Sequence, residues 1–255
     1  MYQLMKKYRL VFYIFFGLCF SIPAWANSFK LIQSYPVHHP IFIQGLQLDG
    51  SNRLIYSAGL YGRSEIGYLN LATGKTYGVK KLLPSVFAEG LTVTDDGIWQ
   101  ITWREQMAFL RDAKTLTIKK TVHYLGEGWG LAYDKRQKVL WLSDGSSKLQ
   151  KLDAKNFNKI SEISVQNNGK PVEYINELEY ANGFLYANIW QSNKIIKINP
   201  NTGKVLNTYD FSPLVSTLNL TDPDSILNGI AHIGGQSFYI TGKNFGVVWQ
   251  VLFTQ

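Results

Sequence analysis

Cysteine is almost absent from this 255-residue chain, and the only one, Cys19, lies in an apolar segment near the N-terminus. Removal of that segment would leave no thiol, which excludes a cysteine nucleophile, a zinc–thiolate site and a disulfide scaffold from the mature protein. Histidine is also scarce. The four histidines form neither an H-x-x-x-H pair nor an H-E-x-x-H motif, so a histidine-based zinc site is not expected.

Only one long apolar run occurs, and it lies near the start of the chain. Three basic residues precede the run at 10–22, and Ala24-Trp25-Ala26 follows it. A charged start, a short apolar stretch and an A-x-A site are the three parts of a secretory signal peptide. An uncleaved membrane anchor is the alternative, but the run is shorter than the roughly 20 residues that span a bilayer.

We therefore expect residues 1–26 to be a signal peptide cleaved before Asn27, and residues 27–255 to form one domain in the periplasm or outside the cell. No later run is long enough to span a membrane. The formal net charge is +8, but the basic residues are scattered and form only pairs. Scattered charge is typical of a solvated surface, so we expect no nucleic-acid partner, and we expect a monomer.

Sustained helical periodicity is missing too, apart from one short candidate at 211–218, so the predicted class is all-β. One local pattern occurs five times: a polar or aromatic residue, a small or acidic residue and an aliphatic residue, followed by a turn and an apolar strand. The five copies are Gln44-Gly45-Leu46, Glu89-Gly90-Leu91, Trp129-Gly130-Leu131, Asn176-Glu177-Leu178 and Asn228-Gly229-Ile230.

The units recur at intervals of 40 to 52 residues, and each begins with a hairpin whose turn is Asp-Gly, Asn-Gly or Gly-Gly in most copies. A second, weaker pair of strands follows in each. Four strands at this period are typical of a propeller blade, so the sequence predicts a single-domain, five-bladed β-propeller. Strand 247–253 would pair beside 29–35 and close the ring. A β-sandwich is the alternative, but it would not explain five repeats of the same turn chemistry.

A propeller brings the inner strands of all blades to one axis, so equivalent positions converge. The residues that open the units are Gln44, Glu89, Trp129, Asn176 and Asn228, and those where the partner strand returns are Gly59, Trp103, Asp144, Trp190 and Lys243. These two rings differ from blade to blade in charge and size, which favours a binding site.

Each of these residues also has a plainer interpretation. The tryptophans could merely fill the channel, Glu89 could be a satisfied or surface carboxylate, and Lys243 could be a solvated lysine. Because three tryptophans fall in register in the repeat, we favour a binding role over simple filling of the channel. Among them, desolvation would raise the pKa of Glu89 and suit it to proton transfer, and Lys243 could stabilise an oxyanion.

The motifs resemble those of the plant and bacterial glutaminyl cyclases over essentially the whole mature chain. The segments that carry the resemblance are 42–46, 61–64, 87–92, 100–103, 128–131, 143–145, 175–180, 186–190, 227–231 and 241–243. The resemblance implies a five-bladed propeller that converts N-terminal glutamine of peptides or proteins to pyroglutamate, with no cofactor or metal. It further implies Glu89 as the catalytic acid/base and a glutamine pocket lined by Phe42, Gln44, Phe87, Trp103, Trp129, Asn176, Trp190 and Lys243. Within that pocket we expect Lys243 and Asn176 to stabilise the oxyanion.

The chain departs from the family pattern after Lys243. Where the family usually has a Trp-Pro pair, this chain has Asn244-Phe245-Gly246, which keeps an aromatic residue and loses the proline. Two other functions stay open at this stage. One is a lactonase-like hydrolase with channel-bound calcium, for which Glu89, Asn176 and Asn228 would be the ligands. The other is a scaffold that binds peptides or proteins without catalysis.

Overall fold

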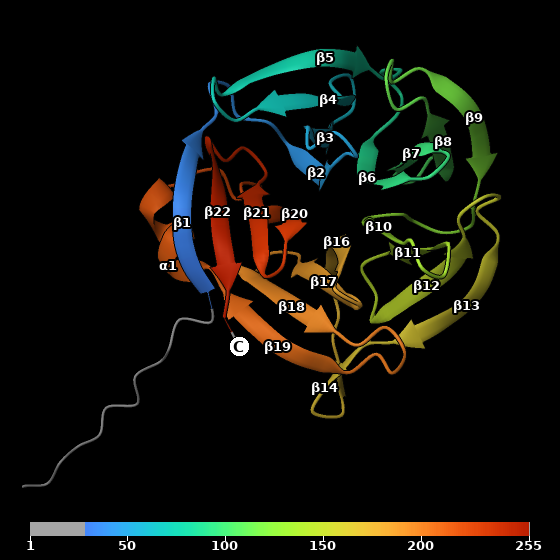
Figure 1. The fold of residues 1–255 in the computed structure, drawn as a ribbon. Helices are drawn as coiled ribbons and strands as arrows, with labels where there is room; N and C mark the ends of the chain where they lie inside the picture. Colours follow the sequence, from blue (N-terminus) through green and yellow to red (C-terminus); the bar gives the residue numbers. More distant parts are fainter. Residues whose placement is uncertain (1–28, 255) are drawn as a thin grey trace, which may run out of the picture.

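The computed structural model describes residues 29–254, so the predicted signal peptide lies outside the described residues. Five four-stranded antiparallel sheets are arranged as blades around a central axis (Figure 1). This arrangement confirms the predicted all-β, five-bladed propeller.

The strands fall into blades in chain order, except for the first. Blade 1 contains β2 (Ile43–Leu48), β3 (Leu54–Ala58), β4 (Glu65–Asn70) and β5 (Lys75–Lys81). Blade 2 contains β6 (Ala88–Thr94), β7 (Gly97–Thr102), β8 (Met107–Arg111) and β9 (Ile118–His123). Blade 3 contains β10 (Leu131–Asp134), β11 (Val139–Ser143), β12 (Lys148–Asp153) and β13 (Lys159–Ser164). Blade 4 contains β16 (Ile175–Ala181), β17 (Phe184–Ile189), β18 (Lys194–Ile198) and β19 (Val205–Asp210). Blade 5 contains β20 (Leu227–Gly234), β21 (Ser237–Gly242), β22 (Val247–Phe253) and β1 (Phe29–Pro36).

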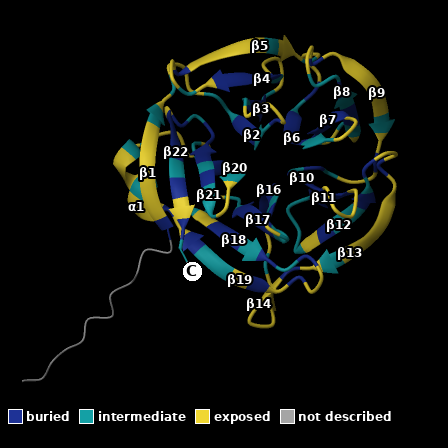
Figure 2. Ribbon diagram, in the orientation of Figure 1, coloured by how far each residue is buried: buried dark blue, intermediate teal, exposed yellow. Residues whose placement is uncertain are grey.

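Burial falls from the axis outward in each blade (Figure 2). The inner strands are largely buried, whereas the outer strands β5, β9 and β13 are largely exposed. The hairpin turns follow the sequence prediction. Between β16 and β17, Asn182 and Gly183 both have positive φ, at 55° and 85°, which is the geometry of the Asn-Gly turn that joins two twisted strands.

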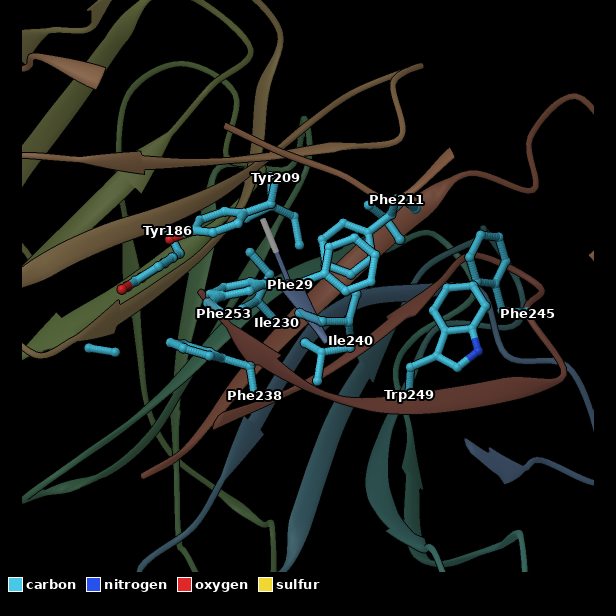
Figure 3. Close-up of a cluster of buried hydrophobic side chains, with 14 of the residues drawn as sticks. Phe29, Tyr186, Tyr209, Phe211, Ile230, Phe238, Ile240, Phe245, Trp249 and Phe253 are labelled. Atoms are coloured by element: carbon cyan, nitrogen blue, oxygen red, sulfur yellow. The ribbon is translucent and has the colours of Figure 1, made fainter. Parts of the chain in front are cut away.

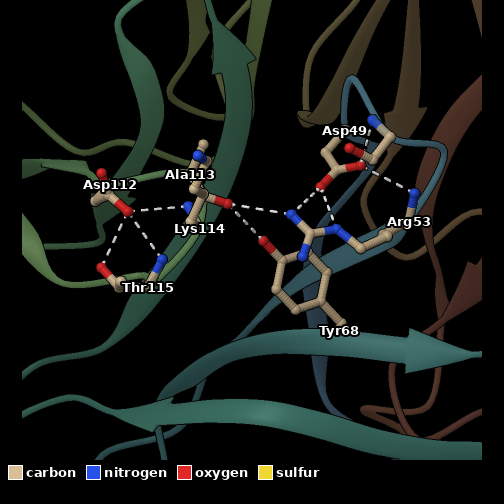
Figure 4. A network of polar contacts seen from close by, with 8 residues as sticks. Asp49, Arg53, Tyr68, Asp112, Ala113, Lys114 and Thr115 are labelled. Atoms are coloured by element: carbon tan, nitrogen blue, oxygen red, sulfur yellow. Dashed lines mark hydrogen bonds and ion pairs between the residues drawn. The ribbon is translucent and has the colours of Figure 1, made fainter.

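Polar contacts join neighbouring blades at their turns (Figure 4). Arg53 forms an ion pair with Asp49 at 2.6 Å, and its guanidinium carbon lies 4.3 Å from the centroid of the Tyr68 ring. Both Arg53 and the Tyr68 hydroxyl donate to the carbonyl of Ala113 in blade 2. That carbonyl lies in a turn held by the Asp112 side chain, so a local turn motif positions an acceptor for the adjacent blade.

The ring closes as the sequence predicts. β1 pairs antiparallel with β22, with Phe29 opposite Phe253. Stacked aromatic rings fill the junction between blades 4 and 5 (Figure 3). The ring centroids of Phe29 and Phe211 are 4.2 Å apart, and those of Tyr209 and Phe253 are 3.9 Å apart. β1 is thus the outer strand of the fifth blade, so the start and the end of the domain are held in one sheet and the ring is closed.

A β-bulge interrupts the inner hairpin of four blades near its axial end. The residues that the bulges leave out of the regular register are Gln44, Glu89 with Gly90, Asn176 with Glu177, and Asn228 with Gly229. Bulges of this kind redirect side chains and often lie next to functional sites. They account for the position of the opening residue in four of the five sequence units; in the third, Trp129 precedes β10 and no bulge occurs.

Glycine follows the opening residue in four units, and in three of them a Cβ would meet the backbone of the next inner strand. At Gly229 it is the φ of 119° that favours glycine. A Cβ on Gly90 would lie 2.7 Å from the backbone nitrogen of Leu131. The fourth blade has Glu177 at this position, and its carboxyl oxygens accept hydrogen bonds from the backbone nitrogens of Leu46 at 3.3 Å and Ile230 at 3.0 Å. A single buried side chain therefore ties blades 1, 4 and 5 together at the axis.

Little structure lies outside the blades. The predicted short helix is present as α1 (Ser212–Val215), followed by one turn of 3-10 helix, η1 (Ser216–Leu218). A small hairpin, β14 (Gln166–Asn167) with β15 (Lys170–Pro171), was not anticipated from the sequence. Within residues 29–254, none of the helices has the length and apolar character needed to cross a membrane.

Candidate active site

A pocket of about 460 Å³ opens where the inner strands begin, at one end of the central channel. Its size lies within the range of small-molecule sites. The lining residues are Phe42, Gln44, Leu60, Phe87, Glu89, Trp103, Arg104, Glu127, Trp129, Asn176, Trp190, Asp224 and Lys243. All nine site residues predicted from the sequence are in this set, so the structure brings them together.

The two convergent rings only partly line the pocket. Gly59 and Asp144 do not line it, and Asn228 lies fully buried beneath its floor. Four lining residues were missed: Leu60, Arg104, Glu127 and Asp224. Two of them had a usable signal, because Arg104 follows Trp103 directly and Glu127 stands two positions before Trp129.

Aromatic side chains form two walls. On one side, Phe87 makes edge-to-face contacts with Phe42 at 6.4 Å and with Trp103 at 5.5 Å between ring centroids. On the other side, Trp129 meets Trp190 edge-to-face at 5.8 Å. Edge-to-face pairs of this kind restrict each ring to one orientation, so the walls form an apolar slot of defined shape.

Glu127 joins the two walls at the rim. Its Oε2 accepts a hydrogen bond from the indole Nε1 of Trp103 at 2.6 Å and from that of Trp129 at 3.0 Å. Its Oε1 accepts one from Arg104 Nε at 3.1 Å. Burial alone would raise the pKa of Glu127, but the hydrogen bonds from Trp129, Trp103 and Arg104 outweigh it and hold the pKa below its ordinary value. The side chain is therefore an anion at neutral pH.

Glu89 is the buried carboxyl of the pocket, with 5% of its surface exposed. Glu89 lines the pocket, and in the described part of the chain its carboxyl group makes no hydrogen bond and no contact ion pair. Burial raises its pKa well above the ordinary value. The charge of Lys243 opposes this rise, while Glu127 and Glu105 add to it.

Lys243 is the buried lysine of the same pocket. Its Nζ lies 5.0 Å from the centroid of the Phe42 ring, and a backbone bridge pairs the two residues. Burial lowers the pKa of Lys243, whereas the carboxyl groups of Glu89 and Asp224 act to raise it. Burial thus favours the neutral forms of both Glu89 and Lys243, and the attraction between their charged forms opposes it.

Asn228 orients Gln44 at the pocket floor. The Asn228 Nδ2 donates to the backbone carbonyl of Ile43 at 2.9 Å, which fixes the orientation of its amide. The same nitrogen donates to Gln44 Oε1 at 3.2 Å. The Gln44 oxygen is therefore engaged from below, and its Nε2 is left as a donor for the pocket. Asn176 lines the pocket beside it.

The segment that replaces the usual Trp-Pro pair is anchored by other means. Phe245 is buried and meets Trp249 edge-to-face at 5.7 Å. Asn244 has φ 58°, and its backbone nitrogen donates to the carbonyl of Ile41. Core packing of Phe245 thus holds the loop beside Lys243 without a proline. Across residues 29–254, no group of three or more histidine, cysteine, aspartate or glutamate side chains could hold a metal ion.

Comparison with known proteins agrees with this geometry. A family model described as glutamine cyclotransferase matches residues 21–253. The Arabidopsis thaliana protein named glutaminyl-peptide cyclotransferase is 35% identical over 233 residues, which cover 90% of this chain and 72% of that protein. The crystal structure of Myxococcus xanthus glutaminyl cyclase superposes with a TM-score of 0.81 at 33% identity, covering 88% of this chain and 95% of that one. This chain therefore belongs to the glutamine cyclotransferase family of enzymes.

Proposed function

We propose that the protein cyclises N-terminal glutamine of peptides or proteins to pyroglutamate and releases ammonia, with Glu89 transferring the proton and no metal ion taking part. One observation carries the proposal: a buried carboxyl with no hydrogen-bond partner among the described residues lines the same aromatic pocket as a buried lysine, and burial raises the pKa of that carboxyl. Membership in the glutamine cyclotransferase family supports the reaction class.

The reaction needs no protein nucleophile, because the substrate supplies both reacting groups. The aromatic walls hold the glutamine side chain folded, with its α-nitrogen next to the γ-carboxamide carbon. The α-amine attacks the carboxamide carbon in its neutral form, and the Glu89 carboxylate accepts the proton that this nitrogen loses as the new bond forms. Glu89 then returns that proton to the amide nitrogen as the carbon–nitrogen bond breaks, so ammonia leaves and the lactam nitrogen keeps one hydrogen.

Negative charge develops on the carboxamide oxygen during the attack, and hydrogen-bond donors are needed to stabilise it. Lys243 and Asn176 both line the pocket, and we assign them to this oxyanion. Gln44 Nε2 is a further donor, because Asn228 occupies its oxygen. Lys243 in its charged form also lowers the pKa of Glu89 and so favours the carboxylate that accepts the proton.

Ammonia release from a dipeptide with N-terminal glutamine is the direct test. We expect purified protein to release one ammonia per pyroglutamyl product, at a rate unchanged by EDTA. Loss of activity with EDTA would overturn metal independence and favour the calcium-dependent alternative. Peptide binding without ammonia release would overturn catalysis and favour a binding scaffold.

The rate should rise with pH across the acid range. Glu89 must be ionised to accept a proton, and burial raises its pKa, so protonation disables the enzyme at acid pH. Deprotonation of the substrate amine, with a reference pKa of about 7.7 to 8.0, adds to the same trend. We therefore expect kcat/KM to rise from pH 5 to mildly alkaline pH. A flat profile between pH 5 and 8 would contradict the mechanism.

We also propose that the protein works after export, as a monomer acting on peptides or proteins with N-terminal glutamine. The charged start, apolar run and A-x-A site at 24–26 support export to the periplasm or beyond. N-terminal sequencing of protein recovered from the exported fraction should begin at Asn27. Recovery of uncleaved protein in the membrane fraction would instead indicate an anchor.

A further inference from the structure

Glu127 is the rim carboxylate for which the proposed reaction has no use, yet it contacts both walls of the pocket. One oxygen, Oε2, accepts the indole N–H of Trp103 from blade 2 and of Trp129 from blade 3. An anionic acceptor makes each of these bonds stronger than a neutral one would be. The carboxylate therefore sets the distance between two side chains that come from different blades.

We propose that Glu127 is a positioning residue of this active site, which clamps the Trp103 and Trp129 indoles in the orientation that encloses the glutamine side chain. The expected effect on the rate rests on the proposed function. The clamp itself rests only on the contacts between Glu127 and the two indoles.

A second contact supports the clamp. Arg104 donates to the other oxygen of Glu127, and its guanidinium carbon lies 3.8 Å from the Trp103 ring centroid. Arg104 thus covers the outer face of one indole while it fixes the carboxylate that holds both. The Glu127 side chain is 38% exposed, so the ion pair with Arg104 by itself contributes little, and the indole bonds carry the argument.

Clamping matters because the proposed reaction is intramolecular. The enzyme gains rate by holding the amine and the carboxamide in an attack geometry, and a displacement of about 1 Å in such a site can lower the rate about 100-fold. Without Glu127 the two indole N–H groups lose the one acceptor that they have among residues 29–254, and the rings can turn. Both kcat and kcat/KM should then fall.

Glu127 also acts on Glu89 through space. Among the charged groups that face Glu89, Lys243 lowers its pKa, whereas Glu127 and Glu105 raise it. Removal of the Glu127 charge should therefore move the acid limb of the pH–rate profile to lower pH. A residue that merely stabilised the fold would not move that limb.

The test compares Glu127→Ala and Glu127→Gln with wild type. We expect Glu127→Ala to lose roughly 10- to 100-fold in kcat/KM, and both indole N–H signals in 15N NMR spectra to move upfield, because the charge-assisted bonds are gone. Trp103→Phe and Trp129→Phe variants assign the signals. Glu127→Gln keeps an acceptor oxygen, so it should lose less activity while the acid limb still moves to lower pH.

Two controls separate the clamp from other effects. Glu105→Gln removes a negative charge near Glu89 that does not contact either indole, so it should move the acid limb and leave the indole signals in place. Glu162→Gln removes a surface carboxylate paired with Lys148 and Lys159, and it should change neither.

Unmoved indole signals in Glu127→Ala would overturn the clamp, whether or not the wild type is active. An unchanged kcat/KM with moved signals would overturn its catalytic role. Absence of turnover in wild type would contradict the proposed function instead, and the indole signals would still decide whether Glu127 holds the tryptophans.

Discussion

Replacing Glu89 with glutamine is expected to lower kcat for ammonia release by about 100- to 10,000-fold, the usual contribution of general acid–base catalysis. Glutamine has nearly the same size and shape, so the aromatic walls should keep their arrangement around it. It cannot accept the proton of the attacking amine or return it to the departing amide nitrogen. The loss should appear in kcat more than in KM, because the apolar contacts that bind the side chain are unchanged.

Folding of this variant must be checked beside its kinetics. Glu89 makes no hydrogen bond within the described residues, so Glu89→Gln should unfold at the same temperature as wild type or slightly above it, since a buried carboxyl is replaced by a neutral group. Turnover close to that of wild type would show that another group carries the proton, and the assignment of Glu89 would be withdrawn.

Replacing Glu177 with alanine is expected to lower the free energy of unfolding by about 2 to 6 kcal/mol, since two buried backbone N–H groups would lose their acceptor, each at a cost of about 1 to 3 kcal/mol. Those groups belong to Leu46 and Ile230, in the first and fifth blades. The effect should be seen in urea denaturation at pH 5, as a lower midpoint with a similar slope.

The pH of that measurement matters because burial, together with the charge of Glu179, raises the pKa of Glu177. A carboxyl whose pKa is higher in the folded than in the unfolded state binds more protons when folded, so the stability it provides is lost as pH rises. Glu177→Gln is the matched variant, because it keeps one acceptor oxygen and cannot ionise. It should be less damaging than Glu177→Ala. Equal stability of Glu177→Ala and wild type would contradict the role of this residue as an axial tie.

The blades could be predicted from the sequence because each is a local hairpin pattern repeated at a regular interval. The nine site residues followed from two facts: equivalent positions converge on an axis, and the motifs resemble a known family. The break in the repeat at Glu177, where the other units have glycine, was also visible in the sequence. Its meaning was not, because only the spacing of the inner strands reveals that a carboxyl bridges three blades there.

Other features of the site depend on contacts between side chains of different blades. Asn228 belongs to the predicted ring but lies beneath the pocket, because its amide is engaged by Ile43 and Gln44. Glu127 belongs to no ring position. Its role arises only when two tryptophans from neighbouring blades bring their indole nitrogens to one oxygen. Periodicity cannot predict such a meeting.

The closure of the ring also has a consequence for the order of assembly. The fifth blade combines a strand from the start of the domain with three from its end, and one of its hydrogen bonds, from Tyr35 to Gln250, spans 215 positions. Contacts so distant in sequence form late, because a long loop must close first. Phe42 and Lys243 meet at the same seam and both line the pocket. A partly emerged chain therefore holds no complete active site, and catalytic competence arises only when the last strand has found the first.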